Sequence, residues 1–468
     1  MLATHPRYGP LVDKGALWLP ADFNYQIVSW QGKLMSDGAP TPGMFDGMGA
    51  FPASTGGKRR VILIRNHENR DNPGLETRVE TGSEFEYDAE TFGGNTKLVV
   101  ECRTTGQRDP VTGRPLREYE VIDDFAILAG TTTNCAGGEF LYKKWITCEE
   151  VVKRSANGVK HGYIFEMDAT ANGPVHALPV LAAGRFAHEA VAWRAGILYL
   201  TEDRSIGFDP QLGQVGACFY RYLPGAKPTR SGNLAHDQGI LQALRLRDEP
   251  HANMNTGRTV GVPHAVDWVT IAEPDHDDDT DFQTDRAPGF TPVRIQAQDQ
   301  GAAYFNRLEG AWAYGTGRSS KIYFDATSGG AAGLGQVWEY DATRATLTLL
   351  YESTSAATLT QPDNLVVLPT GDILLCEDSG FEQHLRGLTR EGEIYNFAKI
   401  GANASEFCGA CFDRGTQTLY VNQQGFLGNL PDGPPGGRAV TYAIYGPFLE
   451  PPRWNRFPSR RPPFPRRR

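Results

Sequence analysis

The sequence predicts an all-β fold, a six-bladed β-propeller with an axial metal site and insertions between the blades. The chain of 468 residues contains 53 Gly and 31 Pro, which favours short strands joined by tight turns. One hairpin-like pattern recurs six times, and further strand-like stretches lie between the copies. Six sheets of about four strands each, arranged radially, form a propeller whose innermost strands border a central channel.

Each copy starts on a polar or acidic residue, continues through two strands joined by a polar turn, and ends near acidic residues. The start and the end of an antiparallel hairpin lie side by side, so the polar ends of each copy should meet. If these hairpins are the inner strand pairs, all six sets of polar ends converge on one mouth of the channel. The six copies span residues 46–68, 131–150, 184–204, 309–325, 363–378 and 406–422.

The ends of the chain are expected to close the ring. YQIVSW near the start and TYAIYGPF near the end are both strand-like and can lie in one blade. We divide the chain into an N-terminal segment (1–21), a propeller domain (22–448) and a Pro- and Arg-rich C-terminal tail (449–468) that we expect to be disordered.

Charge and cysteine content narrow the function. With 46 Lys and Arg against 55 Asp and Glu, the net charge of -9 argues against a nucleic-acid surface and suits a protein that concentrates cations. No apolar run approaches the roughly 18 residues of a membrane helix.

Seven cysteines in so long a chain do not form a disulfide framework. Cys408 and Cys411 form a C-x-x-C without a βαβ context, and we interpret them as apolar strand residues.

The converging acids raise an electrostatic problem that cations would relieve. Two carboxylates about 5 Å apart repel by roughly 3 kcal/mol at an effective dielectric near 20. Carboxylates are ligands of Ca²⁺, whereas a thiolate such as Cys135 suits a softer transition metal. The alternatives are a solvated acidic rim and a buried structural thiol at Cys135. His67 and His188 directly precede Glu68 and Glu189, and strand alternation lets at most one residue of each pair reach the channel easily. We expect the glutamates to be the ligands and the histidines to support the ligands or to pack.

Several ordered motifs resemble the PhoX-type alkaline phosphatases over roughly residues 22–448. They are NHEN (66–69), TTTNCAGG (131–138), TCEE (147–150), GRFAHEAVAW (184–193), RLEGAW (307–312), QPDNL (361–365), HLRGLTREGEIY (384–395) and SEFCGACF (405–412). This resemblance implies a six-bladed propeller that binds Ca²⁺ and a pair of Fe³⁺ ions at the channel mouth. It also implies hydrolysis of phosphomonoesters, an activity that serves phosphate acquisition. After TTTNCAGG the family usually continues with T-P-W-G-T-W, whereas this chain reads EFLYKKWITCEE.

The resemblance also implies roles for individual residues. Cys135 is the expected iron-binding thiolate. Asn134 and Arg386 are hypothetical phosphate contacts, with a surface loop position as the alternative for Arg386. The expected carboxylate ligands, distributed between iron and calcium, are Glu68, Glu149, Glu189, Glu309, Glu377 and Glu406.

Two other function classes fit the same repeat pattern. A calcium-dependent lactonase or phosphotriesterase would bind calcium alone at the mouth, and a non-catalytic propeller would bind a partner without metal. For the phosphatase we expect a small phosphoester substrate, no nucleic acid or membrane partner, and a monomer. The family resemblance implies a periplasmic or extracellular location, although MLATHPRYGP has neither an apolar signal core nor a twin-arginine motif.

Overall fold

The computed structural model describes residues 8–225, 233–277, 291–315, 320–380, 382–400, 405–425 and 437–448. The predicted tail at 449–468 lies outside these residues. The helices are α1 (Val293–Asp299) and the 3-10 turns η1 (Leu181–Ala183) and η2 (Leu234–His236). None of the described helices has the length and apolar character needed to cross a membrane. The predicted all-β class is confirmed.

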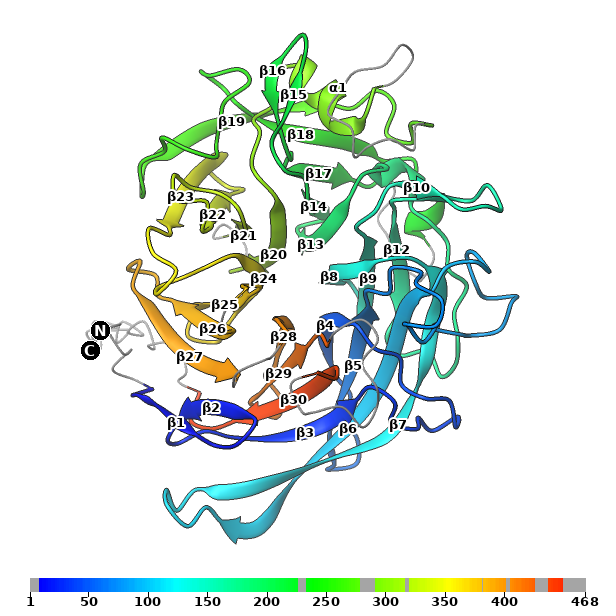
Figure 1. Ribbon diagram of the computed structural model, residues 1–468, viewed down its shortest axis with the longest axis vertical. Coiled ribbons are helices and arrows are strands. Elements are labelled where there is room, and N and C mark those ends of the chain that lie inside the picture. The colour runs from blue at the N-terminus through cyan, green and yellow to red at the C-terminus, as the bar shows by residue number, and fades with distance from the viewer. Residues whose placement is uncertain are drawn as a thin grey trace, which may run out of the picture.

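The strands form successive groups arranged around a common centre (Figure 1). The first group contains β4 (Phe45–Pro52), β5 (Arg59–His67), β6 (Gly93–Arg108) and β7 (Pro115–Thr131). The second contains β8 (Asn134–Phe140), β9 (Lys144–Glu149) and β12 (Ile164–Asp168). The third contains β13 (His188–Arg194), β14 (Ile197–Glu202), β17 (Tyr220–Leu223), β18 (Ile240–Leu246) and β19 (Pro263–Thr270).

The remaining groups complete the circle. The fourth contains β20 (Leu308–Tyr314), β21 (Lys321–Ala326), β22 (Gln336–Asp341) and β23 (Thr346–Glu352). The fifth contains β24 (Pro362–Val367), β25 (Ile373–Glu377), β26 (His384–Leu388), β27 (Ile394–Ile400), β2 (Leu17–Pro20) and β1 (Leu11–Asp13). The sixth contains β28 (Phe407–Asp413), β29 (Thr418–Gln423), β30 (Val440–Tyr445) and β3 (Asn24–Trp30). Two short hairpins lie outside the groups, β10 (Lys153–Arg154) with β11 (Lys160–His161) and β15 (Gly207–Asp209) with β16 (Gly213–Val215).

Two connections depart from a simple succession of groups. Strand β19 pairs with β18 and also with β23, so the third and fourth groups form one continuous sheet. Strand β3, near the N-terminus, pairs with β30, near the C-terminal end of the described chain, with Asn24 opposite Tyr445. The predicted closure of the ring by the two chain ends is therefore confirmed.

The first strand of each group lies at the centre (Figure 1). Around the ring, β4, β8, β13, β20, β24 and β28 each contact the next, and β28 contacts β4 again. A Cβ on Gly138 would lie 1.7 Å from the carbonyl oxygen of Val191, and one on Gly409 would lie 2.2 Å from that of Asp46. Glycine is therefore required where these neighbouring backbones meet.

The axis of the ring is filled by side chains. The cavity between the innermost strands, lined in part by Met48, Trp145 and Trp312, has a volume of only ≈ 20 Å³. A cavity of this size has room for about one water molecule. The small residues of the innermost strands thus bring the backbones together and leave no wide pore at this level, so ligands must approach the ring from an end.

Candidate metal centre

One hairpin geometry is repeated in all six groups. The first residue of each innermost strand pairs with the last residue of the second strand, and a register shift follows in the innermost strand, at once in five groups and one residue later, after Cys408, in the sixth. A β-bulge at this point re-aims the next side chain. The residues placed second in the innermost strands, at these bulges, are Asp46, Cys135, Glu189, Glu309, Asp363 and Cys408.

A repeated backbone hydrogen bond fixes a second position beside each bulge. The N–H of the residue after the second strand donates to the carbonyl of the residue before the innermost strand, over 2.8 to 3.2 Å. This bond ties the two ends of each hairpin together. The donors are Glu68, Glu150, Asp203, Thr327, Asp378 and Gln424.

The two repeated positions bring acidic side chains and one thiol together. Five overlapping groups of three residues each have ligand atoms within 4.8 Å of one another. The groups are Asp46, Glu68 and Cys135; Cys135, Glu150 and Glu189; Glu150, Asp203 and Glu309; Glu189, Glu309 and Asp363; and Asp363, Asp378 and Glu406. We call these nine carboxylates and the Cys135 thiol the acidic cluster.

Glu189 shows most directly that the acidic cluster suits cations. Its side chain is buried, and neither carboxylate oxygen has a hydrogen-bond partner among the residues that the structure describes. It shares groups with Cys135, Glu150, Glu309 and Asp363. A buried carboxylate without a donor is costly unless it is protonated or bound to a cation. Carboxylate oxygens with one thiol are a donor set that fits both hard and softer metal ions.

The protonation of the acidic cluster reflects burial and mutual repulsion. Burial, followed by the charges of Glu309 and Glu150, raises the pKa of Glu189 well above its usual range. Burial and the neighbouring Asp378 raise the pKa of Asp363 to about 8. Burial and the charge of Asp46 likewise raise the pKa of the Cys135 thiol. Without cations the cluster therefore retains protons that a metal ion would displace.

Two arginines border the acidic cluster. The Nη2 atom of Arg70 lies 2.5 Å from Oε1 of Glu68. Arg307 forms a two-point contact with Asp203, at 2.9 and 3.0 Å, and its Nη2 lies 2.8 Å from Oε1 of Glu309. Their side chains are 45% and 29% exposed, so both guanidinium groups are accessible from solvent. Neither arginine was among the predicted site residues, although each lies two positions from a predicted ligand.

Five of the seven predicted ligands lie in the acidic cluster: Glu68, Cys135, Glu189, Glu309 and Glu406. Glu149 and Glu377 do not. Glu149 accepts hydrogen bonds from the backbone N–H groups of Thr132 and Gly162, at 3.1 and 2.8 Å. These two glutamates are the last residues of β9 and β25, and their carboxylates accept hydrogen bonds from groups outside the acidic cluster. The residues that follow them, Glu150 and Asp378, join the cluster instead.

The two predicted phosphate contacts also have internal partners. The Asn134 side chain accepts from Thr131 Oγ1 at 2.6 Å and donates to Thr147 Oγ1 at 3.0 Å. Arg386 is buried, and its Nε donates to Glu377 Oε1 at 2.8 Å. The structure therefore gives both residues a role in holding their sheets and turns neither side chain toward the acidic cluster.

The histidines beside the predicted ligands pack as expected. The Nδ1 atom of His67 lies 2.8 Å from the carbonyl oxygen of Gly43, and Nε2 of His188 lies 2.9 Å from that of Gly184. The other members of the acidic cluster were not among the predicted ligands. They are Asp46, Glu150, Asp203, Asp363 and Asp378.

A family model described as alkaline phosphatase PhoX matches residues 6–425. The chain belongs to this family. Membership in the alkaline phosphatase PhoX family agrees with the predicted enzyme class and implies metal dependence, which the acidic cluster suits. A search of curated proteins finds no significant match.

Solved structures resemble the chain mainly in fold. PhoX of Pseudomonas fluorescens, in a complex with vanadate described as a transition-state analogue, shares 16% identity and a TM-score of 0.65 over 94% of this chain and 97% of that chain. A gluconolactonase of Xanthomonas campestris shares 12% identity and a TM-score of 0.37 over 94% and 98%. The calcium-binding protein regucalcin of Agrobacterium tumefaciens shares 10% identity and a TM-score of 0.34 over 91% and 97%.

Proposed function

We propose that this chain is a six-bladed β-propeller phosphatase that hydrolyses small phosphomonoesters with Ca²⁺ and Fe³⁺ bound at the acidic cluster. The observation that carries the proposal is Glu189, a buried carboxylate without a hydrogen-bond donor, beside a thiol and three further acids. Such a group is expensive in a folded protein unless it binds cations. The ring of six innermost strands supports the blade number.

The donor atoms suggest how the cations are distributed. The groups that share Cys135 contain Asp46, Glu68, Glu150 and Glu189, and a thiolate favours iron over calcium. The group of Asp363, Asp378 and Glu406 offers oxygen atoms alone, which suits calcium. Bound there, the cations would neutralise charge on the phosphoryl oxygens and on the leaving oxygen.

Arg70 and Arg307 are the residues that we assign to phosphate binding, in place of Asn134 and Arg386. A guanidinium group binds phosphate through two parallel hydrogen bonds. Both arginines contact carboxylates that we assign to the metals, and both are accessible from solvent. When those carboxylates bind cations, their attraction for the guanidinium groups weakens, and the arginines can orient a phosphate over the cluster.

Elemental analysis combined with a chromogenic phosphomonoester assay tests this function. Iron together with calcium and phosphatase turnover would support it, whereas calcium alone with lactone hydrolysis would support the lactonase alternative. We expect Arg307→Gln to raise KM for the phosphoester by about tenfold, since a two-point phosphate contact is lost. Arg258→Gln is the matched control, because Arg258 forms a similar two-point contact with Glu249 outside the acidic cluster, at 2.7 and 2.8 Å.

A further inference from the structure

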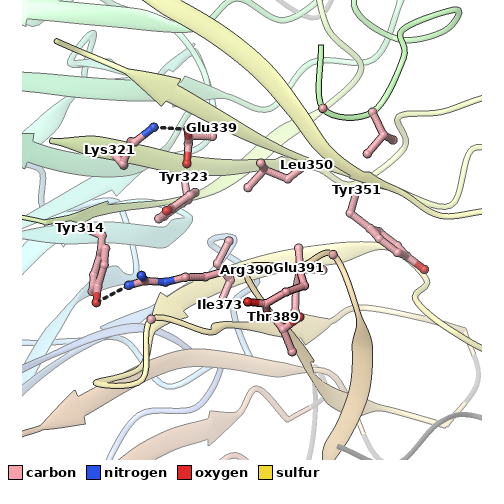
Figure 2. Close-up of a pocket in the computed structure, with 15 residues that line it drawn as sticks. Tyr314, Lys321, Tyr323, Glu339, Leu350, Tyr351, Ile373, Thr389, Arg390 and Glu391 are labelled. Carbon is pink, nitrogen blue, oxygen red and sulfur yellow. Dashed lines mark hydrogen bonds and ion pairs between the residues drawn. The ribbon is translucent and has the colours of Figure 1, made fainter. Parts of the chain in front are cut away.

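A second pocket lies between the fourth and fifth groups of strands (Figure 2). It has a volume of ≈ 530 Å³. Strand β20 begins beside Glu309 of the acidic cluster and ends at Tyr314, which lines this pocket. Five residues of strand span about 16 Å, so Tyr314 lies well away from the metal centre. A ligand in this pocket would not compete for the phosphoester site.

Aromatic and aliphatic side chains form much of the pocket wall. Figure 2 shows Leu350 above Arg390 in the view and Tyr351 at one side of the pocket. The tyrosines offer flat apolar faces, and their hydroxyl groups supply polar edges. This combination favours a ligand with a planar ring system. The apolar and aromatic lining residues are Val260, Tyr314, Tyr323, Leu350, Tyr351, Ile373 and Leu388.

One charged cluster in the pocket is already neutralised. Lys321 forms ion pairs with Glu339 and, at 3.0 Å, with Asp341. The Tyr323 hydroxyl also bonds to Glu339, and burial together with that carboxylate raises the pKa of the phenol. This end of the pocket is therefore satisfied internally, and it leaves little free charge for a ligand.

Arg390 differs from Lys321 because its charge has no acidic partner. Within the described part of the chain, no carboxylate forms an ion pair with it. Its Nη2 donates to the Tyr314 hydroxyl at 2.9 Å, and the guanidinium lies 5.4 Å from the centre of that ring. Gly371 has a φ of +89°, which favours glycine, and the guanidinium rests against this turn. The contact with Tyr314 leaves other donors of Arg390 for an anion.

We infer that this pocket binds a small organic anion with an aromatic body, of the aryl carboxylate class. The fixed guanidinium of Arg390 matches the planar carboxylate through two hydrogen bonds. The tyrosine rings and Leu350 accommodate the aromatic body, and the volume of ≈ 530 Å³ is large enough for a bicyclic ring.

Titration calorimetry with 2-naphthoate on the metal-loaded full chain tests the site. We expect saturable binding of one molecule per chain. The uncharged amide of the same shape, 2-naphthamide, should bind at least about tenfold more weakly, because it lacks the charge that Arg390 recognises. Saturating inorganic phosphate should leave naphthoate binding unchanged, since none of the pocket's lining residues belongs to the acidic cluster.

Two variants separate the charge of the site from its shape. Arg390→Ala should weaken naphthoate binding by about tenfold, whereas Arg103→Ala removes an exposed cation from the β6 hairpin and should leave the affinity unchanged. Leu350→Trp keeps the charge but fills the space, and it should abolish binding while phosphatase turnover stays at the wild-type value. The inference is overturned if wild type shows no saturable naphthoate binding, or if Arg390→Ala binds naphthoate as tightly as wild type does. It is also overturned if wild type binds naphthamide as tightly as naphthoate.

Discussion

At the scale of single residues, Glu189 carries the strongest consequence. In Glu189→Gln a neutral amide replaces a buried carboxylate of the same shape, so the metal-free protein loses one source of repulsion. The same change removes a central metal ligand. We therefore expect the variant to match or exceed the Tm of wild type in chelator. Added metal should stabilise the variant less than it stabilises wild type. The difference is about 2.7 kcal/mol if the affinity of the variant for the metal falls a hundredfold.

Thermal melts in chelator and in excess metal check this prediction. Glu139→Gln is the matched control, because Glu139 is another carboxylate whose pKa is raised by burial, to about 7, and it lies outside the acidic cluster. The control should gain the same stability from metal as wild type does. An equal metal-induced rise in Tm for Glu189→Gln and wild type would exclude Glu189 as a ligand.

Cys135 decides between the iron phosphatase and a calcium-only propeller. Replacing the thiol by an alcohol in Cys135→Ser keeps the shape but supplies a harder and poorer ligand. We expect iron content and phosphatase turnover to fall by orders of magnitude while the fold remains. A structural thiol would instead cost on the order of 1 kcal/mol with iron and turnover nearly unchanged. Iron per chain and turnover, measured in one preparation, distinguish the two outcomes.

At the scale of the strand, the predicted ligands divide according to register. The sequence shows that acids occupy the ends of the repeated hairpins, which suffices for Glu189 and Glu309 in the innermost strands. It does not show which of two neighbouring acids, such as Glu149 and Glu150, is the last residue of the strand. Glu149 and Glu377 are the last residues of their strands, and their carboxylates have hydrogen-bond partners outside the cluster. The residues that follow them, Glu150 and Asp378, therefore project into the cluster. A one-residue difference reverses the side chain, and it depends on tertiary hydrogen bonds.

The bulges explain why Asp46 and Asp363 were also missing from the predicted ligands. A strict two-residue alternation cannot assign side chains across the register shifts that follow Phe45 and Pro362. The shifts are nevertheless repeated in every innermost hairpin. Alignment of the six copies by their bulges, and not by their acids, would have placed both aspartates at the ligand position.

The pairing of Arg386 with Glu377 yields a prediction for β25 and β26. Arg386→Ala would leave a buried carboxylate without its cation, and it should destabilise the protein by about 3 to 5 kcal/mol. KM for the phosphoester should stay near the wild-type value in the folded fraction. The double variant Arg386→Met with Glu377→Leu, which removes both charges, should recover most of the stability. Denaturant unfolding and KM measurements check this; an unchanged midpoint with a raised KM would restore Arg386 as a phosphate contact.

At the scale of the whole molecule, the sequence predicted the architecture better than the chemistry of its centre. Repeated hairpins and turn-forming residues determine the succession of sheets, and the pairing of β3 with β30 follows from matching strand patterns at the two ends. The nine-stranded sheet formed through β19 was not predicted, because its pairings with β18 and β23 are both long-range. Arg70 lies outside the repeated positions. Arg307 precedes its innermost strand, where the other copies carry unlike side chains such as Met44 and Ala187, so periodicity could not reveal either arginine.

The acidic cluster lies at one mouth of the channel, and its acids make the stability of the whole protein depend on pH and on bound metal. In the metal-free protein the pKa values of Glu189, Glu309 and Glu406 are raised, first by burial and then by neighbouring carboxylates, and that of Asp363 is raised to about 8. Between the unfolded value of about 4 and the folded values, the native state therefore binds more protons than the unfolded state. Stability of the metal-free protein should fall as the pH rises through this window.

Bound cations should reverse that slope, because they compete with the same protons and bind more tightly as the pH rises. We expect Tm in chelator to decrease from about pH 5 to pH 8, and Tm in excess calcium and iron to increase over the same range. Acids outside the cluster, such as Glu139, shift the Tm curves with and without metal equally. The difference between the two curves therefore reports on the acidic cluster alone. Parallel Tm curves with and without metal would show that the acids at the mouth do not bind cations, and the proposed metallophosphatase would then be untenable.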